Sequence, residues 1–437
     1  MFQKGKDKII ARFGGAFFRN IALLMSGTVI AQIITAASMP VLSRLFLPAA
    51  FGVLGMLNSI VNITAGISAL RFDMAVMIPK EEKEAANLLG LSLFLVSATS
   101  LFLAILLPLL GGQIAEVLNS PELAPWLLVA PVLVLITGAY QSLTYWSSRQ
   151  KEFRRLSTVT VSASGASAGA KILAGLAGLK TLGLIGGQVL GQALACLLLA
   201  FQVWRGEGRK IVGLIERKTL WAVARKYRDF PKYNAPVTLL NGLTNGTPIL
   251  LFGVFFGPAV AGFYSVAYLI LKMPVQLVTN SIRQVYLQRS SERRNQGKSL
   301  FKDQWQLTAL LAALGAIPMF AAALAAPLGF EWVLGAEWRE SGVYAQALMI
   351  YLFTMLIGVP STALIPVLNL QRGFFIWQVL TLTLSATGIV LGSLQGSPVL
   401  GVALFAAAKA AMMFLLIAVV AYWTRREDKN PTESYSN

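Results

Sequence analysis

Long stretches without a charged residue dominate the chain, and each predicts a membrane-spanning helix. Seven of them reach the roughly 20 apolar residues that a helix needs to cross the hydrocarbon core of a bilayer. They are 20–43, 45–70, 85–115, 123–148, 181–204, 304–330 and 341–371. Because these runs are continuously apolar rather than alternating, they exclude a transmembrane β-barrel.

Three further stretches extend the same pattern. The run 156–179 is interrupted only by Lys171, while 233–271 and 373–408 are each long enough for two helices separated by a turn that contains Gly and Pro. The helix after the second of these turns continues past Lys409. The pattern therefore predicts an all-α polytopic membrane protein with about 12 transmembrane helices.

Composition agrees with a membrane protein. The 437 residues are 56% hydrophobic and 13% charged, against about 25% charged in soluble domains. The absence of His and the single Cys exclude a Ser-His-Asp triad, His-ligated metal sites and an intrachain disulfide. We therefore expect no metal, no cofactor and no enzyme activity.

The net charge of +18 could indicate a nucleic-acid-binding protein, but the placement of the charges argues otherwise. Most of the 37 Lys and Arg fall in the N-terminal segment, in alternate connections between the predicted helices and in the C-terminal tail. By the positive-inside rule these segments are cytoplasmic, which places both termini in the cytoplasm and requires an even number of spans. The basic charge thus predicts topology, with no nucleic acid as partner. The basic N-terminus leads into a span-length helix, so we do not expect a cleaved signal peptide.

A weak internal repeat divides the chain into halves. The turn PAAFG at 48–52 resembles PAVAG at 258–262, and a helix from Gly183 to Trp204 resembles one from Gly401 to Trp423 at nearly the same offset. Two six-helix lobes related by a parallel pseudo-twofold axis would follow, an arrangement that supports alternating access. We expect lobes at 1–204 and 234–424, a basic amphipathic cytoplasmic linker at 205–233, and a cytoplasmic tail at 425–437.

Charges inside or at the ends of the predicted spans are all cationic. They are Arg44, Arg71, Lys171, Lys272, Arg283 and Lys409. A cation in a membrane helix usually faces a water-filled cavity or extends its side chain to the interface. Both interpretations are open for Lys272, which shares a helix face with Tyr264 and Tyr268, and for Arg44. For Lys171 and Lys409 we expect a structural role.

Amides and hydroxyls also repeat at helical spacing. Asn58 precedes Asn62 by one turn, Gln141 precedes Tyr145, and Asn241 precedes Asn245. Such faces form hydrogen bonds between helices or line a cavity that accepts sugars, and the pattern does not distinguish the two. The candidate sugar-contacting residues are Asn58, Asn62, Gln141, Tyr145, Asn241, Asn245, Tyr264 and Tyr268.

The pattern of apolar and basic residues in the linker predicts an interfacial amphipathic helix. Leu220, Trp221, Ala224 and Tyr227 fall on one face, with Lys and Arg on the remainder. Contact with anionic lipids is the simpler role for this helix, and substrate recruitment or partner docking is the alternative.

Several ordered stretches resemble a known family, the bacterial polysaccharide transporters or O-antigen-type flippases of the multidrug/oligosaccharidyl-lipid/polysaccharide exporter superfamily. The similarity extends from about residue 20 to 300 and more loosely to the C-terminus. The stretches that carry it are SGTVIAQ (26–32), PVLSRLFLPAAFG (40–52), RFDMAVMIPKEEKEAANLLGLSL (71–93), YWSSRQKEFRR (145–155), GLIGGQVLGQ (183–192), KYRDFPKYNAP (226–236) and GFYSVAYLILKMP (262–274).

This resemblance implies a flippase in the bacterial cytoplasmic (inner) membrane. Such a protein moves undecaprenyl-diphosphate-linked oligosaccharide units to the outer leaflet for O-antigen (lipopolysaccharide), capsule or exopolysaccharide biosynthesis. It also implies a cationic central cavity, and a polysaccharide polymerase and glycosyltransferases as partners beside membrane lipids. By likeness to the related lipid II flippases, the candidates for contact with the diphosphate are Arg44, Arg71 and Lys272.

Two other functions fit the sequence less well. An ion-coupled small-molecule exporter of the same fold would need carboxylates in the membrane, and the predicted spans contain no Asp or Glu. A membrane glycosyltransferase or polymerase would need a DxD pair or a sizeable outer loop, and the sequence has no DxD and only short outer connections.

Overall fold

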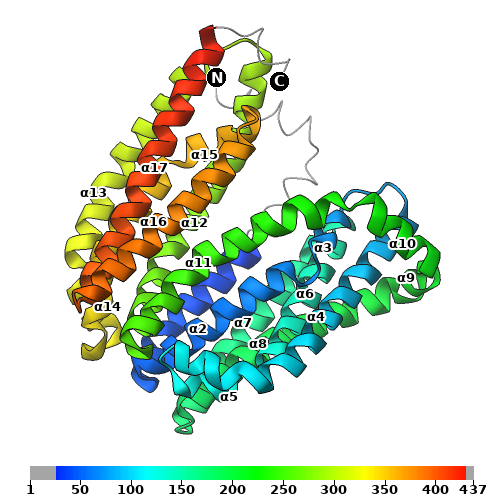
Figure 1. Ribbon diagram of the computed structural model, residues 1–437, viewed down its shortest axis with the longest axis horizontal. Coiled ribbons are helices and arrows are strands. Elements are labelled where there is room, and N and C mark those ends of the chain that lie inside the picture. Colours follow the sequence, from blue (N-terminus) through cyan, green and yellow to red (C-terminus); the bar gives the residue numbers. More distant parts are fainter. Residues whose placement is uncertain (1–25, 430–437) are drawn as a thin grey trace. The chain divides into compact units, whose positions relative to one another are not determined.

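The computed structural model describes residues 26–429, and these divide between Gly246 and Thr247 into two compact units (Figure 1). The basic N-terminal segment and the end of the tail, expected to be cytoplasmic, lie outside the described residues. Within 26–429, ten helices are long and apolar enough to cross a membrane, and a bent pair is an eleventh candidate. The protein is thus an all-helical, multi-pass membrane protein.

The first unit is built from long helices joined by short ones. The long helices are Ser26–Leu45, α2 (Pro48–Ser68), α4 (Glu82–Val117), α6 (Ala130–Arg149), α7 (Phe153–Leu176) and α8 (Lys180–Val203). The short ones are α3 (Phe72–Ala75), η1 (Pro121–Leu123), α5 (Ala124–Leu127), η2 (Trp204–Gly208), α9 (Arg209–Leu214), α10 (Arg217–Lys226) and η3 (Phe230–Asn234). Helix α11 (Ala235–Phe256) begins in this unit and ends in the next.

The second unit takes in the end of α11, which is followed by a sharp turn at Gly257. The φ of 85° at Gly257 is readily adopted only by glycine, and Pro258 then starts the next helix. Its helices are α12 (Pro258–Asn295), α13 (Leu300–Leu334), η4 (Ala336–Trp338), α14 (Arg339–Ile357), α15 (Val359–Val367), α16 (Gln371–Leu394) and α17 (Pro398–Lys429). The division into lobes at 1–204 and 234–424 stays a prediction.

Two expected helices are broken in the structure, and proline explains both breaks. The helix expected at 123–148 bends by 55° between Leu127 and Ala130, beside Pro125 and Pro131. The helix expected over 341–371 ends at Ile357, and Pro360 follows at the start of α15. Proline lacks the N–H that would continue the helical ladder, so a new helix begins there.

Helix α7 is not among the ten apolar candidates, because its Ser, Gly and Lys171 lower its hydropathy. Its 24 residues still measure about 36 Å at 1.5 Å per residue, enough to cross a membrane. It packs closely along α8 (Figure 1), since a Cβ on Gly187 would lie 2.5 Å from Cγ of Lys171 and one on Gly191 2.5 Å from Cβ of Ser167. Small residues allow such close approach between membrane helices.

Glycines also allow α16 and α17 to pack closely in the second unit. A Cβ on Gly392 would lie 2.3 Å from Cα of Gly401, and one on Gly388 would lie 2.9 Å from the backbone of Leu404. Each unit therefore contains a hairpin of two long helices held together at glycines.

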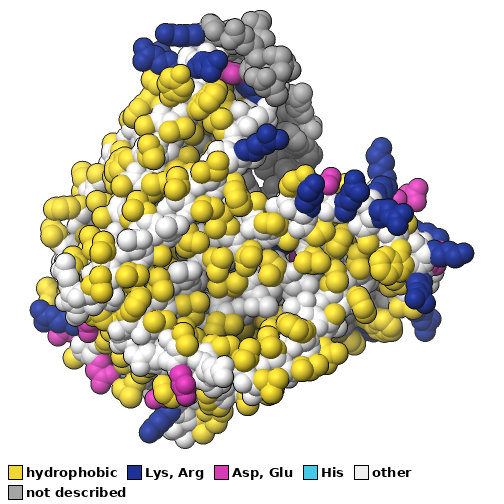
Figure 2. Space-filling view, in the orientation of Figure 1, with side chains coloured by type: hydrophobic (Ala, Val, Ile, Leu, Met, Phe, Trp, Pro, Cys, Tyr) yellow, Lys and Arg dark blue, Asp and Glu magenta, His cyan; other side chains and the backbone are white. Residues whose placement is uncertain are grey.

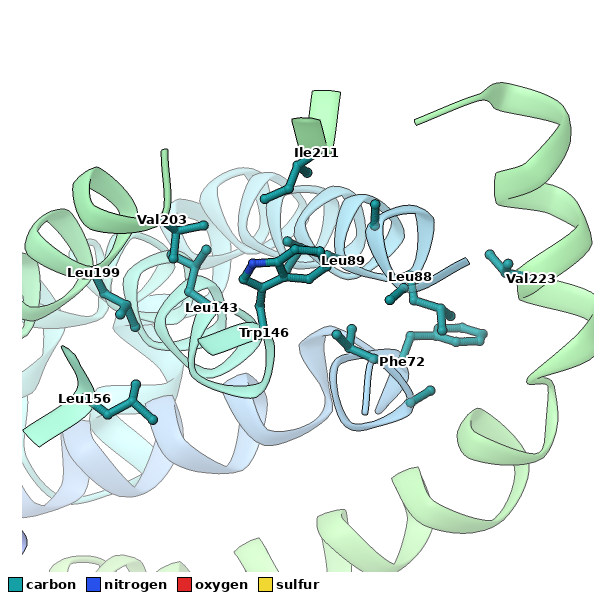
Figure 3. Packing of buried hydrophobic residues seen from close by; sticks show 14 of the residues in the cluster. Phe72, Leu88, Leu89, Leu143, Trp146, Leu156, Leu199, Val203, Ile211 and Val223 are labelled. Atoms are coloured by element: carbon teal, nitrogen blue, oxygen red, sulfur yellow. The ribbon is translucent and has the colours of Figure 1, made fainter. Parts of the chain in front are cut away.

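The core of the first unit gathers the ends of several helices around Trp146 (Figure 3). Leu88 and Leu89 of α4 and Leu199 of α8 are fully buried or nearly so, and Val223 brings α10 into the same cluster. This packing attaches the linker to the helices of the first unit.

Apolar side chains also cover much of the outside (Figure 2). On α13 the exposed positions Ile317, Phe320, Leu324 and Leu328 recur at helical spacing. A contiguous apolar stripe of this length on a soluble protein would promote aggregation, whereas a bilayer buries it. Lys and Arg gather near the ends of the helices in the same view.

Ion pairs attach the linker to the start of α4. Lys226 contacts Glu84 at 2.6 Å, Lys83 contacts Glu216 at 2.8 Å, and the buried Asn87 accepts from the backbone N–H of Glu216 at 3.0 Å. The Lys83 ammonium lowers the pKa of Glu216, and Glu84 raises the pKa of Lys226.

The expected apolar face of the linker helix is packed on the protein at some positions and exposed at others. Leu220, Ala224 and Tyr227 are half-buried, but Trp221 is 73% exposed and Val223 occupies the fully packed position. Helix α10 packs on α4 along a face centred on Val223. Trp221 lies two residues before Val223, and at roughly 100° per residue it points about 160° away from that face.

Candidate functional site

A cluster of aromatic rings and two lysines lies within the second unit. Three helices supply it: α12, α14 and α17. We call it the lysine–tyrosine cluster, and its members are Tyr264, Tyr268, Lys272, Tyr351, Phe405 and Lys409.

The rings of the lysine–tyrosine cluster contact one another in sequence. Tyr268 stacks on Tyr264 at 5.8 Å between centroids and on Tyr351 at 6.5 Å, with interplanar angles of 14° and 16°. Phe405 meets Tyr264 and Tyr351 edge-on, at 6.0 and 6.2 Å. The hydroxyls of Tyr268 and Tyr351 also hydrogen-bond to each other. These contacts fix the rings of three helices in one rigid arrangement.

Both lysines place their ammonium groups against these rings. Lys272 Nζ lies 4.8 Å from the centre of Tyr268, and Lys409 Nζ lies 5.7 Å from Tyr351 and 5.6 Å from Phe405. Lys409 is buried and Lys272 half-buried. Cation–π attraction of this kind contributes about 0.5–2 kcal/mol per contact.

The helices around the lysine–tyrosine cluster carry no opposite charge near it in sequence. Residues 258–291, 341–357 and 398–426 contain no Asp or Glu. Two ammonium groups among aromatic rings, on helix segments without carboxylates, form an environment that favours an anion.

Sequence reasoning found half of this arrangement. The face shared by Tyr264, Tyr268 and Lys272 was expected, whereas Lys409 was expected to be structural only. A signal for Lys409 existed: Phe405 precedes it by four residues, the same aromatic-to-lysine spacing as Tyr268 to Lys272. Tyr351 has no signal of its own, because its position depends on how α14 packs.

Arg71 and Tyr145, predicted for different roles, lie together in the first unit. The Arg71 guanidinium donates to the Tyr145 hydroxyl at 3.1 Å and lies 5.8 Å from the centre of its ring. Arg71 also pairs with the buried Asp73 at 3.6 Å, and burial raises the pKa of that carboxyl while Arg71 partly offsets the rise. The backbone of Arg71 is left-handed, with φ of 63°, which turns the chain between α2 and α3.

The other cationic candidates are less enclosed. Arg44 is exposed near the end of the helix Ser26–Leu45, and the ion pairs found among residues 26–429 do not include it. Lys171 donates to Oε1 of Gln188 at 2.6 Å across the α7–α8 hairpin. That contact links α7 to α8, and the structural role of Lys171 stays a prediction.

The amide candidates lie on neighbouring helices of the first unit. Helix α11 packs closely on α2, as the short distance of 3.3 Å between an added Cβ on Gly242 and Cα of Ile63 indicates. Asn62 is exposed on α2, as are Asn241 and Asn245 on α11, while Asn58 on α2 and Gln141 on α6 are half-buried. Exposed amides on membrane helices favour a water-accessible surface over lipid.

Within the described residues, no group of three His, Cys, Asp or Glu side chains is placed to hold a metal ion. The groups available for binding are therefore ammonium, guanidinium, amide and phenol groups, which bind anions and hydroxylated ligands.

Comparison with known proteins identifies a family and a fold. A family model described as "Polysaccharide biosynthesis protein" matches residues 41–343. No curated protein sequence matches the chain. The family match spans more than half of the chain.

Solved structures of transporters share the fold. An inward-facing multidrug resistance MATE family transporter of the MOP superfamily superimposes with a TM-score of 0.68 at 14% identity, over 92% of this chain and 96% of that one. A MATE transporter from Vibrio cholerae superimposes with a TM-score of 0.55 at 11% identity, over 98% of this chain and 99% of that one. A MOP superfamily transporter from Pyrococcus furiosus superimposes with a TM-score of 0.52 at 14% identity, over 95% of this chain and 96% of that one.

Proposed function

Because the chain belongs to the polysaccharide biosynthesis protein family and has the fold of MOP superfamily transporters, we propose that it flips lipid-linked oligosaccharides across a membrane. The substrate is an oligosaccharide unit carried on undecaprenyl diphosphate, and the mechanism is alternating access between two lobes. The observation that carries this proposal is the lysine–tyrosine cluster.

The chemistry of the lysine–tyrosine cluster suits a diphosphate joined to sugars. Lys272 and Lys409 supply two positive charges for the diphosphate. The hydroxyls and rings of Tyr264 and Tyr268 suit the adjacent sugar. Arg44 and Arg71 are further candidates for the diphosphate. Asn58, Asn62, Gln141, Tyr145, Asn241 and Asn245 are the proposed contacts to sugar hydroxyls.

Membrane potential supplies a driving force without an ion site. An inside-negative potential favours outward movement of an anion by about 2.3 kcal/mol per charge per 100 mV. A charge-driven flippase therefore needs cations along its path but no carboxylate that binds Na⁺ or H⁺. The spans of this chain contain such cations and no Asp or Glu in the stretches around the cluster.

The same charge pattern separates this proposal from an ion-coupled exporter of small molecules. The Pyrococcus furiosus transporter of the same fold is described as having a binding pocket of reversed polarity, which suggests a different function for that protein. In the present chain the candidate site is cationic, which disfavours the cationic drugs that an acidic pocket would bind.

The cellular setting follows from the same proposal. We place the protein in the bacterial cytoplasmic membrane with both termini cytoplasmic, since the basic connections alternate with the predicted spans. Glycosyltransferases that build the lipid-linked unit and a polymerase that consumes it are the proposed partners. O-antigen, capsule and exopolysaccharide are the polymers that such units form.

Reconstitution in liposomes tests the proposal. A labelled lipid-linked oligosaccharide should move between leaflets faster with the protein than in protein-free vesicles, while a cationic dye should leak equally in both. Equal movement of the labelled lipid with and without folded protein would contradict the flippase. Export of the cationic dye alone would instead support the small-molecule exporter.

A further inference from the structure

An open pocket lies where α7 begins and α8 ends, far in sequence from the lysine–tyrosine cluster. Its volume is about 480 Å³, and three arginines line it: Arg154 and Arg155 from α7, and Arg205 from η2. Thr158 and Gln202 add a hydroxyl and an amide. Pockets of a few hundred Å³ are of the size that holds a small ligand or headgroup.

The side chain of Arg155 is held in place at one side of this arginine pocket. It pairs with Glu207 at 3.3 Å, and the same carboxylate accepts a hydrogen bond from the indole N–H of Trp146. Trp146 is fully buried at the centre of the core of this unit (Figure 3). Arg155 therefore cannot turn away without breaking a contact that reaches the core.

Arg154 and Arg205 differ from Arg155, because both are exposed and neither belongs to an ion pair within residues 26–429. Among the described residues that line the arginine pocket, Glu152 is the one carboxylate. Three guanidinium groups against the carboxylates of Glu152 and Glu207 leave one positive charge. That balance matches a singly charged anion such as a phosphodiester.

The apolar surface beside the pocket indicates that such an anion is attached to a lipid. Leu190, Leu197 and Phe201 are each at least 60% exposed and follow one face of α8, and Phe201 forms part of the pocket. Arg205 comes one turn after Phe201, and the exposed Trp204 lies beside it, as aromatic residues do at the level of lipid headgroups. An acyl chain can lie along the stripe while its headgroup reaches the arginines.

We propose that the arginine pocket binds the phosphodiester headgroup of an anionic glycerophospholipid in the leaflet on the basic side of the protein. The inner leaflet is anionic, and basic pockets between membrane helices bind such headgroups. The site is separate from substrate transport, so it holds whether or not the protein flips lipid-linked sugars.

Native mass spectrometry of the full-length protein in detergent tests this site. Phosphatidylglycerol, phosphatidylcholine and soluble glycerol phosphate are titrated against the wild type, the double variant Arg154→Gln/Arg205→Gln, and a control double variant, Lys298→Gln/Arg372→Gln. The control removes the same charge from exposed positions of the second unit, outside the linker helix. Size-exclusion chromatography establishes that all three proteins fold.

The expected result is that the wild type prefers phosphatidylglycerol and that R154Q/R205Q weakens its binding by about thirtyfold, since each of the two arginines contributes about 1 kcal/mol toward an anionic lipid. The control should lose less than twofold. Equal loss in both double variants would overturn the site, as would equal binding of phosphatidylcholine. Binding of soluble glycerol phosphate as tight as that of the lipid would show a free-phosphate site instead and would also overturn it.

If R154Q/R205Q does not fold, Phe201→Ala gives a second test. Removing this ring should weaken the binding of long-chain phosphatidylglycerol more than the binding of short-chain phosphatidylglycerol, because only the longer acyl chain contacts the stripe on α8. Equal effects on the two lipids would contradict the proposed placement of the chain.

Discussion

Lys409 of α17 lies with its ammonium 5.7 Å from the centre of the Tyr351 ring of α14, and the residue is only 7% exposed. A cation at the centre of a membrane helix costs at least about 2.5–3.5 kcal/mol on insertion scales. Cation–π contacts recover part of that cost. A lysine kept in such a place, together with Lys272 on the neighbouring α12, supports the proposal that both bind an anion.

The first prediction concerns the two ammonium groups. Lys272→Ala and Lys409→Ala should each weaken binding of undecaprenyl diphosphate by about tenfold, because each removes a charged hydrogen-bond donor. Lysine-to-arginine variants should retain much of the affinity, since they keep the charge. Isothermal titration calorimetry of the purified protein measures both effects.

Lys171→Met is the matched control for those variants. It also removes an ammonium group from a membrane helix, but one that contacts Gln188 rather than the cluster. Its affinity for undecaprenyl diphosphate should stay within twofold of the wild type. A loss as large as that of K272A would show that binding responds to charge anywhere in the helices.

The second prediction separates the ring of Tyr351 from its hydroxyl. Tyr351→Ala should lower the free energy of unfolding by about 3 kcal/mol, because it leaves a cavity between Tyr268 and Phe405. Tyr351→Phe keeps the ring and should cost about 1 kcal/mol, the value of one hydrogen bond. Thermal unfolding in detergent compares the two, and equal shifts would contradict the stacked arrangement.

The third prediction uses two adjacent glycines of α8. A methyl group on Gly187 would meet the Lys171 backbone N at 2.8 Å, so Gly187→Ala should destabilise the protein by about 1–3 kcal/mol. Gly186 has no neighbour within 4 Å of an added methyl group, and Gly186→Ala should be neutral or stabilise by up to about 1 kcal/mol. Reversal of this order in thermal unfolding would contradict the packing of α7 on α8.

The sequence predicts membrane helices well because the requirement is compositional. A span needs about 20 apolar residues, and charged residues mark its ends. The breaks at Ala130 and at Ile357 were missed because proline permits either a kink or a new helix, and packing decides between them. The side of the linker helix that packs on α4 was not predicted for a related reason: an amphipathic pattern does not specify which neighbour the helix packs against.

The candidate site was predicted where its residues share one helix. Tyr264, Tyr268 and Lys272 recur at intervals of four on α12, so their common face follows from helical geometry. Tyr351 and Lys409 come from helices distant in sequence, and no local pattern reports how three helices meet. The pairing of Arg71 with Tyr145 was missed in the same way, since 74 residues separate the two.

The fourth prediction concerns pH and the linker. Lys83 lowers the pKa of Glu216, so their ion pair stabilises the docked linker fully above the ordinary glutamate pKa of about 4.3 and is lost as the pH falls through the lowered value. Glu84 raises the pKa of Lys226 and Lys226 lowers the pKa of Glu84, so that pair is lost in base as the pH rises through the raised lysine value and in acid as the pH falls through the lowered glutamate value. Docking should therefore persist across neutral pH and weaken in acid.

Hydrogen–deuterium exchange of residues 209–227, corrected for intrinsic rates, measures this docking. Glu216→Gln at neutral pH should raise exchange in the same segment as acid does in the wild type. Arg217→Gln, which changes an exposed linker charge outside these ion pairs, is the control. If Glu216→Gln leaves the exchange of this segment at the wild-type level at neutral pH, the ion pairs do not hold the linker in place.

The rate of lipid movement between leaflets, measured in proteoliposomes under an imposed membrane potential, tests the central claim most directly. A labelled undecaprenyl-diphosphate-linked oligosaccharide should move with the wild type toward the positive side, and the double variant Lys272→Ala/Lys409→Ala should reduce that rate by at least about tenfold. Lys171→Met should flip the lipid at the wild-type rate. If the folded double variant flips the lipid as fast as the wild type, the lysine–tyrosine cluster is not the diphosphate site and the account is wrong.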